Sequence, residues 1–107
     1  MNALKGIKIF VNQTINRRNN IYKLMCELAN LFNKNISNEL KDYCLDSINC
    51  DEIEDDIILL IKDIKLVNYK QRKNVLSNYL NKLKQIKRCG INTSYSRYIF
   101  FLNSILN

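Results

Sequence analysis

Apolar residues recur every three or four positions along most of the chain, the spacing that gathers side chains on one face of an α-helix. The segment 20–33 shows this spacing clearly. Its apolar positions are Ile21, Leu24, Met25, Leu28, Leu31 and Phe32. Asn19 or Asn20 carries a side-chain oxygen suited to capping the start of such a helix. The pattern therefore predicts a helix over 20–33.

The preceding segment carries a pattern that fits two structures. One helical face collects Leu4, Ile7, Val11 and Ile15. Ile7, Ile9 and Val11 also alternate as they would in a β-strand. We predict a helix over 3–17, and the six predicted helices can merge into five.

A shorter amphipathic helix is predicted over 36–48, with a start near Asn35 or Ser37. Its apolar positions are Ile36, Leu40, Tyr43, Cys44 and Ile48. Because Cys44 lies on this apolar side, we interpret it as a buried structural cysteine.

Acidic residues mark the start of the next helix, predicted over 51–67. Asp51 and Glu54 have the spacing of a capping pair, and the helix dipole favours acids in a first turn. The core face of this helix contains Ile53, Ile57, Leu60, Ile61, Ile64 and Val67. Ile58, Leu59 and Leu66 lie off that face. A helix that is apolar around most of its girth is either central in the fold or shared with a partner.

Two further helices complete the pattern. In the helix predicted over 69–89, the apolar residues fall within an arc of about 140° at 100° per residue. They are Val75, Leu76, Tyr79, Leu80, Leu83 and Ile86, with Cys89-Gly90 as a stop. A last helix is predicted over 94–106. Its face contains Tyr95, Tyr98, Ile99, Leu102, Ile105 and Leu106, and Phe100 and Phe101 lie off that face.

Composition supports an all-α fold. The 107 residues, 47% of them hydrophobic, provide one packed core, and there is no proline and only two glycines. The turns that a β-sandwich or barrel needs are therefore scarce. With no internal repeat, low-complexity linker or domain boundary, we predict a single domain, 1–107, that forms a compact bundle of five or six helices.

Catalytic and metal-binding chemistry has little support in the residue types present. The chain has no histidine, the usual general base and the commonest transition-metal ligand. The four cysteines contain no Cys-x-x-Cys pair; they are Cys26, Cys44, Cys50 and Cys89. We predict a protein that is not an enzyme and uses no cofactor or metal.

The chain contains no secretory signal, and its longest apolar run, 57–61, is too short to span a bilayer. We therefore predict an intracellular protein without membrane contact. In a reducing compartment its cysteines are neither bridged nor metal-bound.

Charge is segregated along the sequence. The net charge is +7, yet the segment 39–56 contains eight acids against one lysine, and 62–88 contains nine basic residues against one acid. This asymmetry predicts either mutual packing of the two segments or separate charged surfaces for partners. One stripe of the helix over 69–89 contains Lys70, Lys73, Lys84 and Arg88. The stripe can contact phosphate groups, although any solvated helix face shows the same pattern.

The helix over 69–89 also resembles the signature helix of GINS subunits. These subunits form the four-chain accessory complex of the replicative DNA helicase. The matching residues are Arg72, Val75-Leu76-Ser77-Asn78-Tyr79-Leu80, Leu83, Lys84, Ile86 and Lys87. A second, weaker match is Leu31-Phe32-Asn33-Lys34-Asn35 followed by Glu39-Leu40. Phe32 stands where the family has tryptophan, and Ser37 where proline is usual. The resemblance implies an α-helical assembly module, nuclear and without catalytic residues, whose apolar faces pair with sister subunits.

Three functional hypotheses follow. The first is a noncatalytic helical subunit of an intracellular complex, possessing a GINS-like role in DNA replication. Its predicted partner interface contains Ile58, Leu59, Leu66, Tyr79, Leu80, Phe100 and Phe101. The core of a compact bundle can also accommodate five of these residues, namely Ile58, Leu59, Leu66, Phe100 and Phe101. The second hypothesis is a small viral or mobile-element interaction protein, and the third is a nucleic-acid-binding domain that uses the basic stripe.

Overall fold

The chain forms five helices in a computed structural model that describes residues 3–45, 50–86 and 93–107, with side chains described over 15–45, 53–85 and 95–107. The helices are α1 (Ala3–Leu31), α2 (Asn38–Leu45), α3 (Cys50–Lys65), α4 (Tyr69–Ile86) and α5 (Thr93–Leu106). The described residues contain no strand. The predicted all-α bundle is confirmed.

The two helices predicted over 3–17 and 20–33 form one continuous helix, α1. The expected break at Asn19 and Asn20 does not occur. The segment between the two patterns contains no glycine or proline, and an asparagine within a helix costs less than about 1 kcal/mol relative to alanine. Asn19 and Asn20 are exposed, so no buried contact requires the chain to turn there.

The α1 helix ends in a Schellman motif. The amide of Lys34 donates to the carbonyl of Ala29 (3.0 Å), and the amide of Asn33 donates to that of Asn30 (3.1 Å). Asn33 adopts the left-handed conformation that this motif requires, with φ of 55°. Asparagine tolerates that conformation better than other non-glycine residues, which explains why the helix ends here without a glycine.

Two side chains attach the start of α4 to the end of α1. The guanidinium Nη1 of Arg72 donates to the carbonyl of Leu31 (2.9 Å), the last residue of α1. One turn earlier, the Tyr69 hydroxyl accepts from the side-chain amide of Asn33 (3.2 Å). A cation at a helix C-terminus is favourable because the unpaired carbonyls there carry partial negative charge.

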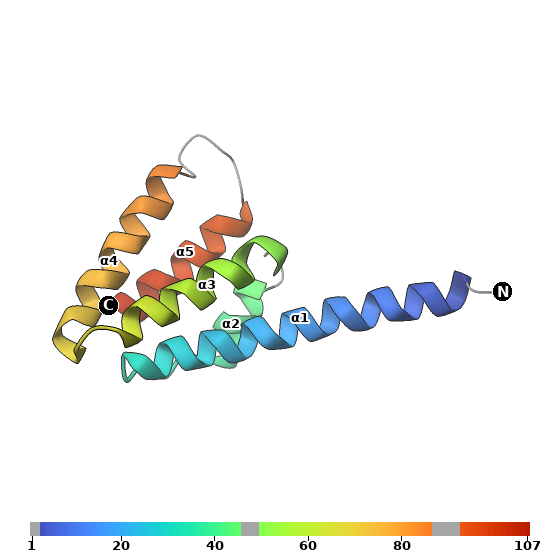
Figure 1. Cartoon of the computed structure of the whole chain (residues 1–107), viewed down its shortest axis with the longest axis horizontal. Coiled ribbons are helices and arrows are strands. Elements are labelled where there is room, and N and C mark those ends of the chain that lie inside the picture. The colour runs from blue at the N-terminus through green and yellow to red at the C-terminus, as the bar shows by residue number, and fades with distance from the viewer. Residues whose placement is uncertain (1–2, 46–49, 87–92) are drawn as a thin grey trace.

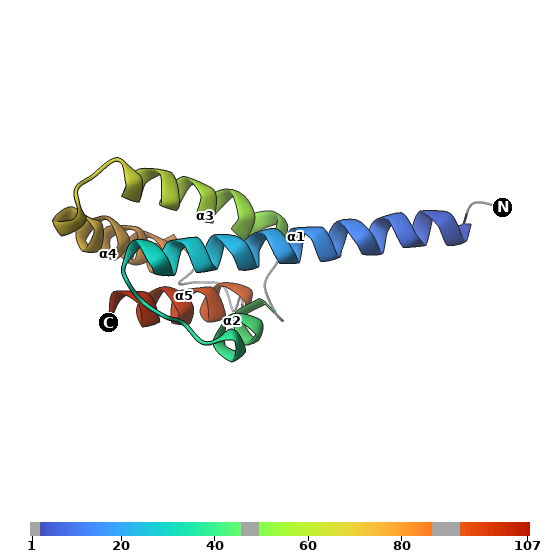
Figure 2. The same cartoon turned by 90° about the horizontal axis from the view of Figure 1, so that it is seen from below.

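The helices surround the core as a ring. The most extensive packing of each helix is against two neighbours, in the order α1, α3, α4, α5, α2 and back to α1. The C-terminal half of α1 runs beside α3, whereas its N-terminal half projects beyond the other helices (Figures 1 and 2). This projection gives the molecule an elongated outline of 57 × 30 × 25 Å.

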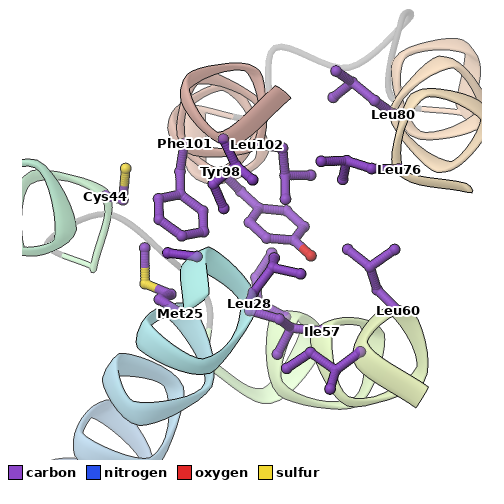
Figure 3. Close-up of a cluster of buried hydrophobic side chains, with 14 of the residues drawn as sticks. Met25, Leu28, Cys44, Ile57, Leu60, Leu76, Leu80, Tyr98, Phe101 and Leu102 are labelled. Atoms are coloured by element: carbon purple, nitrogen blue, oxygen red, sulfur yellow. The ribbon is translucent and has the colours of Figure 1, made fainter. Parts of the chain in front are cut away.

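All five helices contribute to the core inside this ring (Figure 3). The labelled core residues are Met25 and Leu28 from α1, Cys44 from α2, Ile57 and Leu60 from α3, Leu76 and Leu80 from α4, and Tyr98, Phe101 and Leu102 from α5. The predicted apolar face of α3 is buried from Ile53 to Ile64, and the arc of α4 is buried at Leu76, Leu80 and Leu83. The helical registers of α3 and α4 are therefore confirmed.

The register predicted for α5 is wrong at one position. Phe101 was predicted to lie off the apolar face, but it is fully buried. The buried face of α5 is wide because this helix packs against α2 on one side and α4 on the other. Phe100, in contrast, is about half exposed, as the pattern predicts.

Cys44 and Arg97 join α2 to α5. The Cys44 thiol donates to the carbonyl of Arg97 (3.2 Å), and the Arg97 guanidinium donates to the carbonyl of Tyr43 (3.0 Å). Burial raises the pKa of the Cys44 thiol to about 11, although the positive charge of Arg97 acts in the opposite direction. Cys44 is therefore the buried structural thiol that the sequence predicts.

Replacing Leu80 tests the α4 register. Leu80 is 2% exposed, so Leu80→Ala removes buried methyl groups and leaves a cavity. We expect the free energy of unfolding to fall by about 2–5 kcal/mol. Lys84→Ala, on the exposed side of the same helix, should change it by less than about 0.5 kcal/mol. Denaturant titration of both variants measures the difference, and equal effects would contradict this register.

Candidate protein-interaction surface

The predicted interface residues separate into buried and exposed groups. Leu80 and Phe101 belong to the core and are not available at the surface of this fold, and Tyr79 is half-buried. The exposed members, with their exposed fractions, are Ile58 (42%), Leu59 (57%), Leu66 (81%) and Phe100 (54%). Three of these four lie on α3 or directly after it, and Phe100 lies on α5.

Phe100 belongs to a small aromatic cluster of its own. Its ring meets the ring of Tyr43 edge-on, with the centroids 6.4 Å apart and an angle of 72° between the planes. The guanidinium of Arg97 stacks 4.3 Å from the Tyr43 ring centroid. Because these groups already satisfy one another across the α2–α5 contact, the cluster is explained by the fold.

The exposed side of α3 borders a groove. Two shallow depressions, about 280 and 230 Å³ in volume, share Leu24, Glu27 and Ile58 and therefore form one continuous feature between α1 and α3. We call this feature the α1–α3 groove. Its lining residues are Asn20, Lys23, Leu24 and Glu27 from α1, and Glu54, Ile58, Ile61, Lys62 and Lys65 from α3.

Apolar groups form the middle of the α1–α3 groove and charged groups border it. Lys65 forms an ion pair with Glu27 that connects its two walls. Lys23 and Lys62 are exposed. The Oε2 atom of Glu54 is buried and has no hydrogen-bond partner among the described residues. A buried carboxylate oxygen without a donor is costly to the fold, and its burial keeps it out of reach of a group on the surface of the groove.

The length of the α1–α3 groove matches a helical ligand. Its α3 wall runs from Glu54 to Lys65, which is about 16 Å at 1.5 Å per residue. That length corresponds to about three helical turns. Two parallel walls with an apolar centre are the geometry in which an amphipathic helix docks through its apolar face.

Sequence reasoning identified only part of the groove. Ile58 was singled out because it lies off the core face of α3. Leu24 was assigned to the core face of α1, but it is half-buried and lines the groove. Glu54 was assigned only to a capping pair with Asp51, and that assignment gave no indication that it lines the groove.

The basic stripe is exposed in the part of the chain where side chains are described. Lys70, Lys73 and Lys84 are all exposed on α4, and Arg88 lies outside the described residues. Two ion pairs, Arg18–Asp42 (3.9 Å) and Lys65–Glu27, both involve α1 and neither involves a lysine of the stripe. The lysines are thus oriented toward solvent, as both the phosphate-binding and the solvated-face interpretations require.

The described side chains also include two thiols, which bear on disulfide and metal chemistry. Cys26 and Cys44 are free thiols, and the side chains of Cys50 and Cys89 lie outside the described residues. Over the described ranges, no three His, Cys, Asp or Glu side chains gather into a metal site. None of the helices, as far as they are described, combines the length and apolar character needed to cross a membrane.

Tyr79 forms the polar contact at the centre of the core. Its hydroxyl lies 3.0 Å from the hydroxyl of fully buried Tyr98, and the two rings meet edge-on. Burial raises the pKa of Tyr79 to about 12 and that of Tyr98 well above its ordinary value. Tyr79 is therefore accounted for by the core.

This tyrosine pair predicts alkaline instability. Between about pH 10 and 12 the unfolded chain loses phenolic protons that the folded chain keeps, so the free energy of unfolding falls as pH rises. The expected slope is about 1.4 kcal/mol per pH unit for each tyrosine. Tyr79→Phe should reduce the slope relative to that of the unsubstituted chain, because it removes one of the two phenols with a raised pKa. Denaturant titrations at several pH values across this range measure the slope. A slope for Tyr79→Phe equal to that of the unsubstituted chain would contradict the assignment.

Comparisons with known proteins give no relative. No protein-family model matches the chain, and no curated protein or solved structure is similar to it. The interaction surface is therefore defined by the residues of this chain alone.

Proposed function

We propose that this protein is a noncatalytic helical subunit of a protein complex, and that the α1–α3 groove binds an amphipathic helix of a partner protein. The observation that carries the proposal is the exposure of Ile58, which lines the groove, together with the exposure of Leu59 on the same helix and of Leu66 directly after it. A core that already contains residues from all five helices does not need these side chains. Apolar groups kept at the surface beside a groove are typical of binding sites.

The energetics favour a helical partner. Each Å² of apolar surface that the partner covers contributes about 25 cal/mol, so covering Ile58 and its neighbours stabilises the complex. The apolar centre of the α1–α3 groove suits side chains repeated at helical spacing. A flat or extended ligand would contact Leu59 but would leave the groove between the helices unfilled.

Charge specifies the partner further. Lys23 and Lys62 favour acidic residues flanking the apolar face of the partner helix. These charges would set the direction and register of the bound helix more than its affinity.

We further propose that the complex is GINS-like, which would place the protein in the nucleus and in DNA replication. This part of the proposal rests on the sequence resemblance. In the structure, Leu76, Leu80 and Leu83 of the resembling run lie in the core, and Arg72 holds the end of α1. A sister subunit would therefore contact the α1–α3 groove and not the resembling run.

A standalone interaction protein of a virus or mobile element is the alternative within the same functional class. The state of the purified chain separates the two. An obligate subunit with an uncovered groove should associate or precipitate when isolated, whereas a standalone effector should be a well-behaved monomer or homodimer.

The partner should contact the α1–α3 groove in the native complex. We expect a lysine-reactive cross-linker, applied to the complex purified from source cells, to join Lys23, Lys62 or Lys65 to a helical segment of the partner. Ile58→Asp should weaken the complex at least about tenfold, because it places a charge against the apolar face of the partner helix.

Asn81→Asp is the matched control, since it adds the same charge at an exposed position on α4. Thermal unfolding of the isolated Ile58→Asp chain verifies that the fold is retained. The proposal would be contradicted if the cross-links to the partner fall on α4 and none involves Lys23, Lys62 or Lys65. A partner unrelated to GINS subunits would contradict only the GINS-like part.

Nucleic-acid binding is the second candidate function, favoured by the exposure of Lys70, Lys73 and Lys84. A generic basic face gives salt-sensitive affinity that does not depend on sequence. We expect Lys84→Ala to leave partner binding unchanged. We also expect the DNA affinity of this variant to be weak whatever the DNA sequence. Filter binding across a salt series, with Asn81→Ala as control, measures this. A defect of Lys84→Ala confined to DNA affinity would favour the nucleic-acid function.

A further inference from the structure

Lys41 is the one buried charged residue among the described side chains, at 7% exposed. Its ammonium Nζ donates to the sulfur of Cys26 (3.2 Å) and lies 4.9 Å from the ring centroid of Tyr22. A buried lysine is normally paired with a carboxylate. Here its nitrogen is held against a sulfur atom instead.

The contact belongs to a pair of matched links between α1 and α2. The Tyr22 hydroxyl donates to the side-chain oxygen of Asn38 (2.5 Å). Cys26 and Lys41 each lie one turn further along their helices, so the second link repeats the first. Ser37 caps α2 by accepting from the amide of Leu40 (3.2 Å), which fixes the start of the helix. The sulfur and the nitrogen are therefore held close by two helices in a defined register.

We propose that Cys26 and Lys41 form a reversible oxidative cross-link, a sulfenamide bond between Sγ and Nζ, when the protein meets hydrogen peroxide. The substrate class is a small peroxide, and the reductant that reverses the bond is a thiol.

The chemistry balances in two steps. In the first, the Cys26 thiol gives two electrons to hydrogen peroxide, whose O–O bond breaks, and becomes a sulfenic acid with release of one water. In the second, the Lys41 ammonium first releases one proton to solvent. The lone pair of the resulting amine attacks the electrophilic sulfur to form the S–N bond, the S–O bond breaks, and the hydroxide leaves as one water after taking a second proton from the nitrogen. The product has lost two hydrogen atoms relative to the reduced chain. Two thiol molecules restore the thiol and the amine and leave as a disulfide.

Exposure selects Cys26 over Cys44. Cys26 is half-buried whereas Cys44 is buried, so a small peroxide approaches residue 26 more readily. Cys44 is fully buried, and burial holds its pKa near 11, which keeps it as an inert thiol. Lys41 is also the nitrogen nucleophile already in contact with the Cys26 sulfur, so a sulfenic acid formed there meets an amine at once.

Trypsin digestion reports the bond directly in the full-length chain. After mild treatment with hydrogen peroxide and alkylation of the remaining thiols, we expect peptide 24–34 joined to peptide 35–62, lighter by two hydrogens than the sum of the two. Trypsin should not cleave after Lys41, because the lysine is modified. Dithiothreitol should restore cleavage and separate the peptides.

Lys41→Arg is the matched control, since it keeps the charge and the contact with Tyr22 but removes the amine. In this variant we expect no cross-link, and dimedone should trap Cys26 as sulfenic acid. A disulfide from Cys26 to Cys44 or Cys50 would retain cleavage after Lys41 and would overturn the proposal. A joined peptide that retains one oxygen would overturn the condensation step, and an unmodified Cys26 would overturn both steps.

Discussion

The phenol of Tyr98 sets the condition that the rest of the core must meet. A hydroxyl buried away from water needs a hydrogen-bond partner, and the ring of helices provides it through Tyr79 on α4. That contact joins α4 to α5 within a core whose other buried side chains are mostly aliphatic. The short helix α2 packs against both α5 and α1 and so completes the ring.

Hydrophobic periodicity predicted most of this architecture. The patterns of α3 and α4 identified their buried faces because each of these helices has one continuous apolar arc toward the core. The helix break expected at Asn19 does not occur because the preference of asparagine against the helix interior is weak and no buried contact reinforces a break there. Phe101 was misassigned because a helix held between two neighbours buries more than one stripe, and the number of neighbours is a property of the assembled ring.

The candidate site was less predictable for a related reason. The sequence pattern shows that Ile58 lies off the core face of α3. The α1–α3 groove, however, depends on the distance between α1 and α3, and the pattern of each helix alone carries no information about that distance. The contact of Lys41 with Cys26 had no sequence signal at all, since a lysine on a short amphipathic helix is normally solvated. Lys41 is buried where α2 packs against α1, beside Cys26 and the ring of Tyr22. Specific chemistry in this protein therefore arises at helix contacts and not within individual helices.

The position of α5 in the chain has a consequence for synthesis. This helix is the last of the five to leave the ribosome, yet Tyr98, Phe101 and Leu102 lie at the centre of the core. Until it emerges, the nascent chain presents the faces of α2 and α4 that α5 later covers, and exposed apolar surfaces of this kind are what chaperones bind and what causes aggregation during translation.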